Sequence, residues 1–285
     1  MLGHTFRHLP GVGPKSETSL WNAGIRTWED ALNAASLPVS PGKAGLLRQG
    51  IEHSLAASEA DDADWFAARL RTADAWRLFP RFLPHAGYLD IETDGASNPI
   101  VTAVALYHMG RLTTYVHGRN MADLARDLEP VKVLVTFNGK CFDAPIIERV
   151  LKVPCPRAHV DLRFVLKAVG ASGGLKACEK RYGLSRRELD GVDGWGAVLL
   201  WRQWERTGDE RVLETLLAYN AADVLSLEVL LAHALAELLL ATPFAADLTQ
   251  PIPHMAENPF RPDPGVVASV RGAASGYGFR QGRPG

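Results

Sequence analysis

Residues 87–95 read GYLDIETDG, and this stretch indicates both a fold and a chemistry. Its apolar start predicts a β-strand. Successive side chains of a strand alternate between its two faces, so Asp90 and Glu92 would share one face while Leu89 and Ile91 enter the core on the other. An Asp-x-Glu pair also occurs at surface ends of strands. Here it closes an apolar strand, at the edge where open sheets bind ligands.

Two further acids follow in apolar surroundings. Asp143 lies in residues 135–147, VTFNGKCFDAPII, in the first turn of an expected helix, where an acid also serves as a dipole partner. Asp223 follows Tyr219 by four residues on a helix expected over residues 209–240, so the two share one face. A carboxylate among apolar residues is costly without a partner or a metal. Acids that converge from separate elements suit Mg²⁺ or Mn²⁺.

The remaining pattern predicts an α/β fold. A hairpin is expected at Met109 and Gly110, between two β-rich runs, and later strands alternate with helices. This order indicates a mixed sheet flanked by helices, with a small N-terminal helical unit. The Pro- and Gly-rich C-terminal segment is expected to be disordered, either inert or in contact with nucleic acid. The expected units are residues 1–35 (helical unit), 36–84 (helical connector), 85–240 (catalytic domain) and 241–285 (tail).

Bulk composition narrows the function classes. A net charge of −1 over 285 residues gives no general attraction to nucleic acid, so such binding would need local patches. The three cysteines are scattered and odd in number, which favours a reducing, cytoplasmic location over a disulfide or zinc framework. No apolar run is long enough to span a bilayer, so no membrane partner is expected.

Three segments together resemble the motifs of the DEDDy group of DnaQ-like, ribonuclease H-like exonucleases. They are DIET at 90–93, NGKCFD at 138–143 and YNAAD at 219–223, in the family's order and rough spacing. More narrowly, residues 64–232 look like the YprB-like ribonuclease H-like domain, on the segments DWFAARLRTADAWRLFP, HVDLRFVLK and YNAADVLSL. The resemblance implies a ribonuclease H-like sheet and a 3′–5′ exonuclease acting on single-stranded ends of DNA or RNA.

The resemblance also implies roles for individual residues. Asp90, Glu92, Asp143 and Asp223 would hold two divalent cations, Mg²⁺ or Mn²⁺, with Asp90 bridging both. Glu92 and Asp223 would complete the site that carries the attacking water, Asp143 would serve the second ion, and Tyr219 would position the nucleophile. Without metal, repulsion among these acids would raise the pKa of at least one of them.

Two neighbouring residues are expected to support this site. Asn138, with Gly139, allows the sharp turn before Asp143. Asp161, in HVDL, is better placed for a structural role than for direct metal binding. Lys140 and Lys176 could contact substrate phosphates, but isolated lysines near an acidic site are weak evidence for such a role.

Residues 9–25, LPGVGPKSETSLWNAGI, resemble a helix-hairpin-helix motif. Gly11 and Gly13 would let the backbone turn so that amides at the helix start face a DNA phosphate, and Lys15 would add charge. Such binding weakens with salt. Units of this kind also serve as protein-binding or purely structural modules.

Two other functions compete with the exonuclease. One is a nucleic-acid-binding protein that keeps the fold without catalysis, and the other is a structure-specific endonuclease. The presence of all four acids argues against the first. Tyr219, four residues before the last acid, argues against the second, because endonucleases of this fold usually lack it.

Overall fold

A computed structural model of the chain describes residues 1–248 and 252–278. At its centre is a five-stranded sheet in the order β3-β2-β1-β4-β5. The central strand β1 pairs antiparallel with β2 and parallel with β4, so the sheet is mixed, as predicted. The strands span Ala86–Thr93 (β1), Val101–His108 (β2), Arg111–Val116 (β3), Val133–Thr136 (β4) and His159–Asp161 (β5).

The hairpin between β2 and β3 turns where the sequence predicts it. Met109 and Gly110 form the two-residue loop, with φ values of 49° and 76°. Positive φ at both positions matches the twist of the flanking strands, which is the geometry that short hairpins favour. This hairpin brings β3 back beside β2 and fixes its register.

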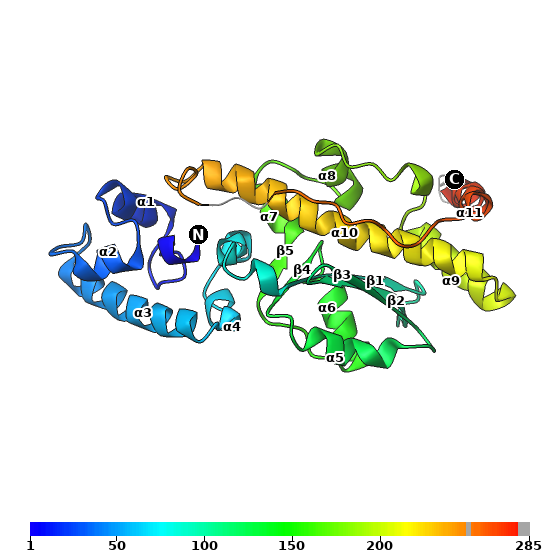
Figure 1. Ribbon diagram of the computed structural model, residues 1–285, viewed down its shortest axis with the longest axis horizontal. Helices are drawn as coiled ribbons and strands as arrows, with labels where there is room; N and C mark the ends of the chain where they lie inside the picture. The colour runs from blue at the N-terminus through cyan, green and yellow to red at the C-terminus, as the bar shows by residue number, and fades with distance from the viewer. Residues whose placement is uncertain (249–251, 279–285) are drawn as a thin grey trace, which may run out of the picture.

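Helices cover both faces of the sheet (Figure 1). The helices α5 and α6 lie on one face, where Leu89 and Ile91 of β1 share a buried cluster with Leu124 and Ile146. The long helix α10 crosses the other face and contacts β1 and β2. The helices around the sheet span Leu124–Leu128 (α5), Asp143–Ile146 (α6, continued by a π-helical turn at Ile147–Leu151), Leu162–Ala168 (α7), Leu175–Arg181 (α8), Gly194–Thr207 (α9) and Glu210–Leu240 (α10).

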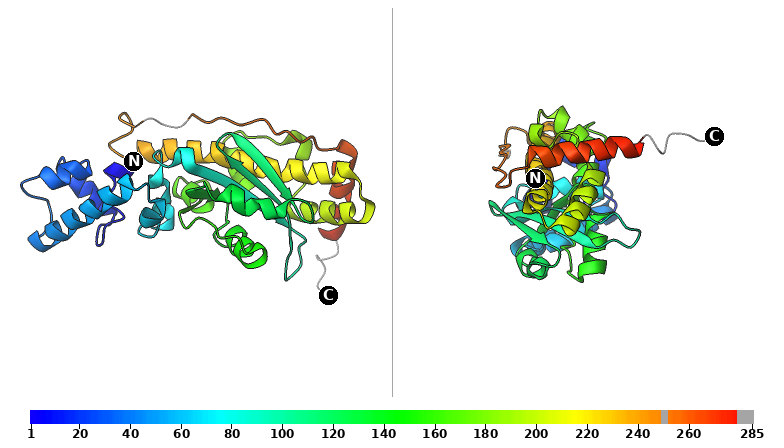
Figure 2. Two further views of the ribbon diagram at one scale, coloured as in Figure 1. Left: turned by 60° about the horizontal axis from the view of Figure 1, so that its bottom comes forward. Right: turned by 90° about the vertical axis from the view of Figure 1, so that its right-hand side faces the viewer.

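The C-terminal segment differs from the expected disordered tail over 241–285. Residues 264–278 form a helix, α11 (Pro264–Gly278), which runs across the direction of α10 and packs against α9 and α10 (Figure 2). Val266, Val267 and Val270 are buried in that contact. Pro and Gly content suggested disorder, but these valines recur at helical spacing and find an apolar surface to cover. Residues 249–251 and 279–285 of the expected tail lie outside the described residues.

The stretch leading into α11 is tied to α10. The Asn258 side-chain amide donates to the Ala218 carbonyl at 2.9 Å, and the Asp263 backbone amide donates to the Thr215 hydroxyl at 3.0 Å. The stretch therefore follows α10 rather than leaving the surface (Figure 1).

The N-terminal part is helical, as predicted. A capping box at Thr27 and Asp30 begins α2 and satisfies backbone amides at its first turn. Among the described residues, no helix has both the length and the apolar character that crossing a membrane requires. The helices span Leu2–His4 (η1), Pro14–Asn22 (α1), Trp28–Asn33 (α2), Pro41–Glu59 (α3), Ala63–Ala67 (α4), Thr72–Leu78 (η2) and Leu83–His85 (η3).

A buried ionic network joins α1 to η2. Arg77 bonds Glu17 at 2.9 Å and Asp74 at 3.4 Å, and Arg7 bonds Asp74 at 2.7 Å. Glu17 also accepts hydrogen bonds from the Thr5 hydroxyl and the Phe6 amide. These paired and hydrogen-bonded charges link the N-terminal unit to the connector before the sheet.

Candidate active site

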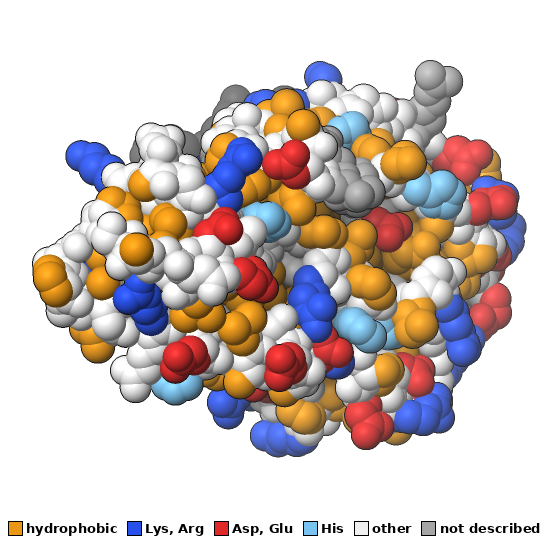
Figure 3. Space-filling view, turned by 60° about the vertical axis from the view of Figure 1, so that its left-hand side comes forward, with side chains coloured by type: hydrophobic (Ala, Val, Ile, Leu, Met, Phe, Trp, Pro, Cys, Tyr) orange, Lys and Arg blue, Asp and Glu red, His pale blue; other side chains and the backbone are white. Residues whose placement is uncertain are grey.

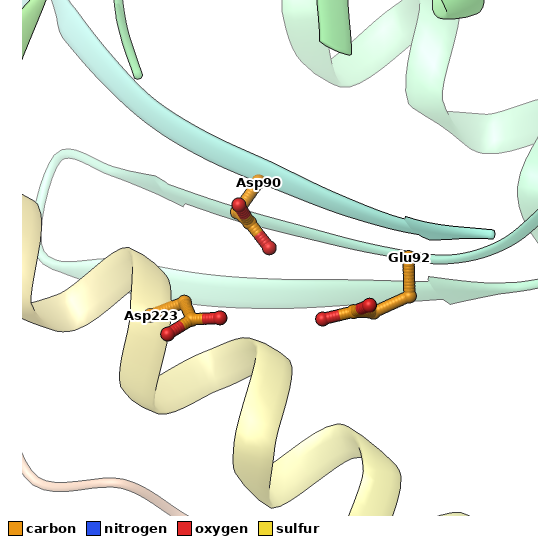
Figure 4. A group of neighbouring side chains, drawn as sticks. All are labelled: Asp90, Glu92 and Asp223. Atoms are coloured by element: carbon orange, nitrogen blue, oxygen red, sulfur yellow. The ribbon is translucent and has the colours of Figure 1, made fainter. Parts of the chain in front are cut away.

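Three carboxylates converge between β1 and α10. Asp90 and Glu92 lie on the β1 face that α10 covers, and Asp223 points at them from α10 (Figure 4). One potential ligand oxygen from each residue lies within 4.8 Å of the others. The strand alternation predicted from the sequence thus places both β1 acids in one cluster, opposite the third.

Helix α10 supplies two functional side chains through its periodicity. Tyr219 and Asp223 are one turn apart, and both are buried. Leu216 and Leu227 of the same helix are buried in the core, so they fix the rotation of α10. The rotation that buries these leucines also turns Asp223 toward the sheet.

Asp143 reaches the cluster from the start of α6. Its Oδ1 atom accepts a hydrogen bond from the Ile91 backbone amide at 3.1 Å. Ile91 stands between Asp90 and Glu92, so this bond anchors Asp143 beside both. Asp143 is nevertheless not part of the 4.8 Å group, so it stands further from the centre than the other three acids.

Asp161 is committed to the loop that carries Asp143. Its carboxylate accepts from the backbone amides of Asn138 at 2.8 Å, Lys140 at 3.2 Å and Arg163 at 3.1 Å. Asn138 has a φ of 66° and accepts from the Arg163 guanidinium through its side chain at 2.6 Å. Both residues therefore shape the turn before α6, and the contacts of Asp161 are those of a structural residue.

Sequence reasoning missed Asn220. Its side-chain amide donates to the Asp90 carboxylate at 2.8 Å and to the Asp90 carbonyl at 3.3 Å, which ties α10 directly to β1. The Asn220 Oδ1 atom is buried without a hydrogen-bond partner among the described residues. The sequence signal for Asn220 was its position next to Tyr219 in YNAAD, because the helix turns both residues toward the sheet.

Sequence reasoning also missed Arg186 and Glu179. The Arg186 guanidinium donates to Asp223 through Nη1 and to Glu179 through Nη2. Lys176 adds a second positive charge, with its Nζ 5.1 Å from the centre of the Tyr219 ring. No local spacing predicts these contacts, because Arg186 lies 37 residues before Asp223 in the chain.

Burial and mutual repulsion control the protonation of this cluster. Burial, followed by the charges of Asp223 and Asp143, raises the pKa values of Asp90 and Glu92 well above their ordinary range. Burial raises the pKa of Asp143 to about 7. Each pair of charged carboxylates this close repels by about 3 kcal/mol at an effective dielectric of about 20. Burial, then the neighbouring acids, also raise the pKa of Tyr219.

This donor set fits hard divalent cations. The cluster offers carboxylate oxygens from two elements, β1 and α10, and the protein charges that face it do not balance all of them. A divalent ion would relieve the repulsion and favour the ionised carboxylates. The unpartnered Asn220 oxygen adds a neutral oxygen beside Asp90.

A model of the RNase H superfamily matches residues 87–235, more than half of the chain. The chain belongs to the RNase H superfamily. The matched residues run from β1 into α10 and include all four acids and Tyr219. Membership of the RNase H superfamily and the acidic cluster together fit nuclease activity.

Among solved structures, the chain is similar to the family B DNA polymerase from the hyperthermophilic archaeon Pyrobaculum calidifontis. It matches at 21% sequence identity with a TM-score of 0.38. The match covers 54% of this chain and 24% of the polymerase chain, so it spans about a quarter of the polymerase's length. No curated protein shows significant sequence similarity to the chain.

The expected nucleic-acid contacts at the N-terminus lie apart from the acids. Gly11 and Gly13 flank the turn before α1, at the end of the molecule opposite α9 (Figure 1). Gly11 has a φ of 75°, Gly13 is the N-cap of α1, and Lys15 is exposed. On the face in Figure 3, Lys and Arg side chains are interspersed with Asp and Glu among the described residues. This mixed surface gives no further support to the helix-hairpin-helix expectation.

Proposed function

We propose that the chain is a metal-dependent 3′–5′ exonuclease that hydrolyses phosphodiester bonds at single-stranded ends of DNA or RNA. The observation that carries this proposal is the convergence of Asp90, Glu92 and Asp223 within 4.8 Å. The cluster stands on a fold of the RNase H superfamily. Within that superfamily we assign the DEDDy type, because Tyr219 precedes Asp223 by one helical turn.

The proposed roles follow from where each group lies. Asp90, Glu92 and Asp223 would hold two divalent cations, Mg²⁺ or Mn²⁺, with Asp143 contributing from the edge of the cluster. The ions would generate the attacking hydroxide and stabilise the leaving 3′ oxygen. Tyr219, buried beside Asp223, orients the attacking water through its hydroxyl. Its pKa is raised by burial and by the neighbouring carboxylates, so the hydroxyl stays protonated and acts as a hydrogen-bond donor.

Two further features complete the proposal. The N-terminal unit would hold the nucleic acid non-specifically, through the turn at Gly11 and Gly13 and the charge of Lys15. Cys141, Cys155 and Cys178 are free, which suits a reducing, cytoplasmic location.

A substrate panel tests this function. Purified protein is incubated with Mg²⁺ or Mn²⁺ and single-stranded DNA or RNA labelled at the 5′ or the 3′ end. A 3′–5′ exonuclease releases a 3′ label at once as a mononucleotide, and converts a 5′-labelled strand into a descending ladder. Circular single strands should survive, since an exonuclease needs an end. Cleaved circles would identify an endonuclease instead. Binding without cleavage would identify a non-catalytic nucleic-acid-binding protein.

Tyr219→Phe refines the test. Loss of a residue that positions the nucleophile should slow cleavage by about 10²-fold or more, since groups of this kind contribute about 10²–10⁴-fold. Binding of Mn²⁺ should be unchanged, because the carboxylates remain. Cleavage at the wild-type rate would remove Tyr219 from the mechanism.

A further inference from the structure

Arg186 occupies a position that the proposed mechanism does not explain. Its guanidinium bonds both Asp223 and Glu179, and 11% of its side chain is exposed. Asp223 belongs to the acidic cluster, while Glu179 lies on α8. An arginine is therefore bound to one of the carboxylates that the proposed function assigns to metal.

We propose that Arg186 is the built-in counter-ion of the acidic cluster, and that it competes with divalent cations for Asp223. In the metal-free protein it neutralises that carboxylate. When a divalent ion binds, Arg186 must release Asp223. This inference rests on the proposed function, because it concerns the same metal ligands.

Electrostatic repulsion opposes simultaneous binding of Arg186 and a divalent ion to Asp223. Arg186 bonds Asp223 directly, so its positive charge lies at one of the three carboxylates of the acidic cluster. A guanidinium and a divalent cation repel each other when they share one carboxylate at short range. Arg186 would also help to orient Asp223, but α10 already fixes that side chain by burying the residues around it. The repulsion between Arg186 and a bound ion should therefore change metal affinity more than the orientation of Asp223 by Arg186 does.

The position of Arg186 in the chain lets its side chain leave Asp223. Arg186 lies between α8 and α9, outside both helices, so its side chain can move without unwinding either. Glu179 gives it a second partner, on which the guanidinium can remain after it leaves Asp223. The Arg186 Nε atom is buried without a partner among the described residues, so the guanidinium is incompletely satisfied where it lies.

The segment that carries Arg186 is held at its far end. Leu189 and Val192 are buried in the cluster formed with α9, α10 and α11, and Val192 accepts a bond from the Lys176 ammonium. Gly191 packs closely against the side chain of Arg271 on α11. A Cβ atom on residue 191 would lie 2.8 Å from the Arg271 Nε atom. Because these contacts hold the far end of the segment in place, release of Asp223 would move only the Arg186 side chain and the residues next to it.

The test is Mn²⁺ binding by isothermal titration calorimetry to the full chain, without nucleic acid. Arg186→Gln should bind Mn²⁺ about tenfold more tightly than wild type, or tighter still. Arg186→Lys should lie between the two, because one ammonium cannot bond both carboxylates as the guanidinium does. The matched control is Arg181→Gln. Arg181 lies on α8 and pairs with Glu237, away from the cluster. The Arg181→Gln variant should therefore bind Mn²⁺ with the affinity of wild type.

Thermal unfolding provides a second readout, because Arg186→Gln leaves the Glu179 carboxylate without its charged partner. The variant should unfold at a lower temperature than wild type in EDTA and gain more from Mn²⁺ than wild type does. If Arg186→Gln does not fold, the affinity of Arg186→Lys decides the matter. Unchanged or weaker Mn²⁺ binding by the folded variants would overturn the competition. Absence of Mn²⁺ binding by wild type would instead overturn the metal site of the proposed function.

Discussion

Asp90 shows how a half-buried strand position can be acidic. Asn220 bonds its carboxylate, while desolvation, followed by the charges of Asp223, Asp143 and Glu92, raises its pKa. Such a residue weakens the metal-free protein, because its charged form is poorly solvated and repelled. The cluster is therefore better suited to binding cations than to stabilising the fold.

The residues of the cluster were predictable to different degrees. Alternation along β1 placed Asp90 and Glu92 on one face, and helical periodicity placed Tyr219 beside Asp223. The contacts of Arg186 and Asn220 were not predicted. Local patterns report which way a side chain points within its own element. They do not report which side chain of another element it meets.

The first prediction concerns pH. Burial raises the pKa of Asp143 to about 7, whereas an aspartate in an unfolded chain titrates near about 4. Between these values the folded, metal-free protein holds a proton that the unfolded chain has released. The free energy of unfolding should therefore fall as pH rises through this window. Thermal unfolding in EDTA at pH 5.5 and at pH 7.5 measures the difference.

Asp143→Asn is the matched control for the pH prediction. The amide does not titrate, so the loss of stability between pH 5.5 and pH 7.5 should be smaller than in wild type. Equal losses of stability in the two proteins would contradict the assignment of this pH dependence to Asp143. Affinity for Mn²⁺ should change in the opposite sense and rise with pH, because protons must leave the carboxylates before the ion binds.

At the level of elements, the strongly patterned segments were predicted and the weakly patterned one was not. The β2–β3 hairpin and α10 follow clear signals, a turn pair between β-rich runs and a long periodic helix. Helix α11 lies in a segment whose Pro and Gly content suggested disorder. Its stability comes from the surface of α9 and α10, and such tertiary packing often overrides local composition.

The second prediction tests whether α11 is docked. Val267→Asp places a charge in the buried contact with α9 and α10, and should lower the free energy of unfolding by about 2–4 kcal/mol or release α11. Ala268→Asp makes the same change at the next residue, which is exposed, and should cost less than about 0.5 kcal/mol. Urea denaturation and limited proteolysis of the C-terminal segment measure both effects. Equal behaviour of the two variants would mean that α11 does not pack in solution as described.

Across the whole molecule, the N-terminal unit and the connector before the sheet share one buried core. Arg77 of η2 bonds Glu17 of α1, and Arg7 bonds Asp74 of η2. Hydrophobic patterning predicted the helices on both sides of this contact. It did not predict the ionic network, because the partners lie about 60 residues apart in the chain.

The third prediction tests that contact. Glu17→Gln removes one of the two carboxylates that pair with the buried Arg77 and leaves Asp74 as its charged partner, so it should lower the free energy of unfolding by about 3 kcal/mol. Arg81→Gln is the control, because Arg81 pairs with Asp61 where both side chains are exposed, and its loss should cost less than about 1 kcal/mol. Similar costs in chemical denaturation would show that the buried network does not hold the two parts together.

The most direct measurement of the central claim is cleavage of a 5′-labelled single-stranded oligonucleotide by wild type and by Asp90→Asn, with and without Mn²⁺. Asp90→Asn removes a charge from the centre of the cluster and keeps the side chain's shape. We expect wild type to shorten the strand only with the metal, and Asp90→Asn to be at least about 10³-fold slower while unfolding at a similar temperature. Equal rates for the two proteins, or no cleavage by folded wild type with either Mn²⁺ or Mg²⁺, would contradict the account.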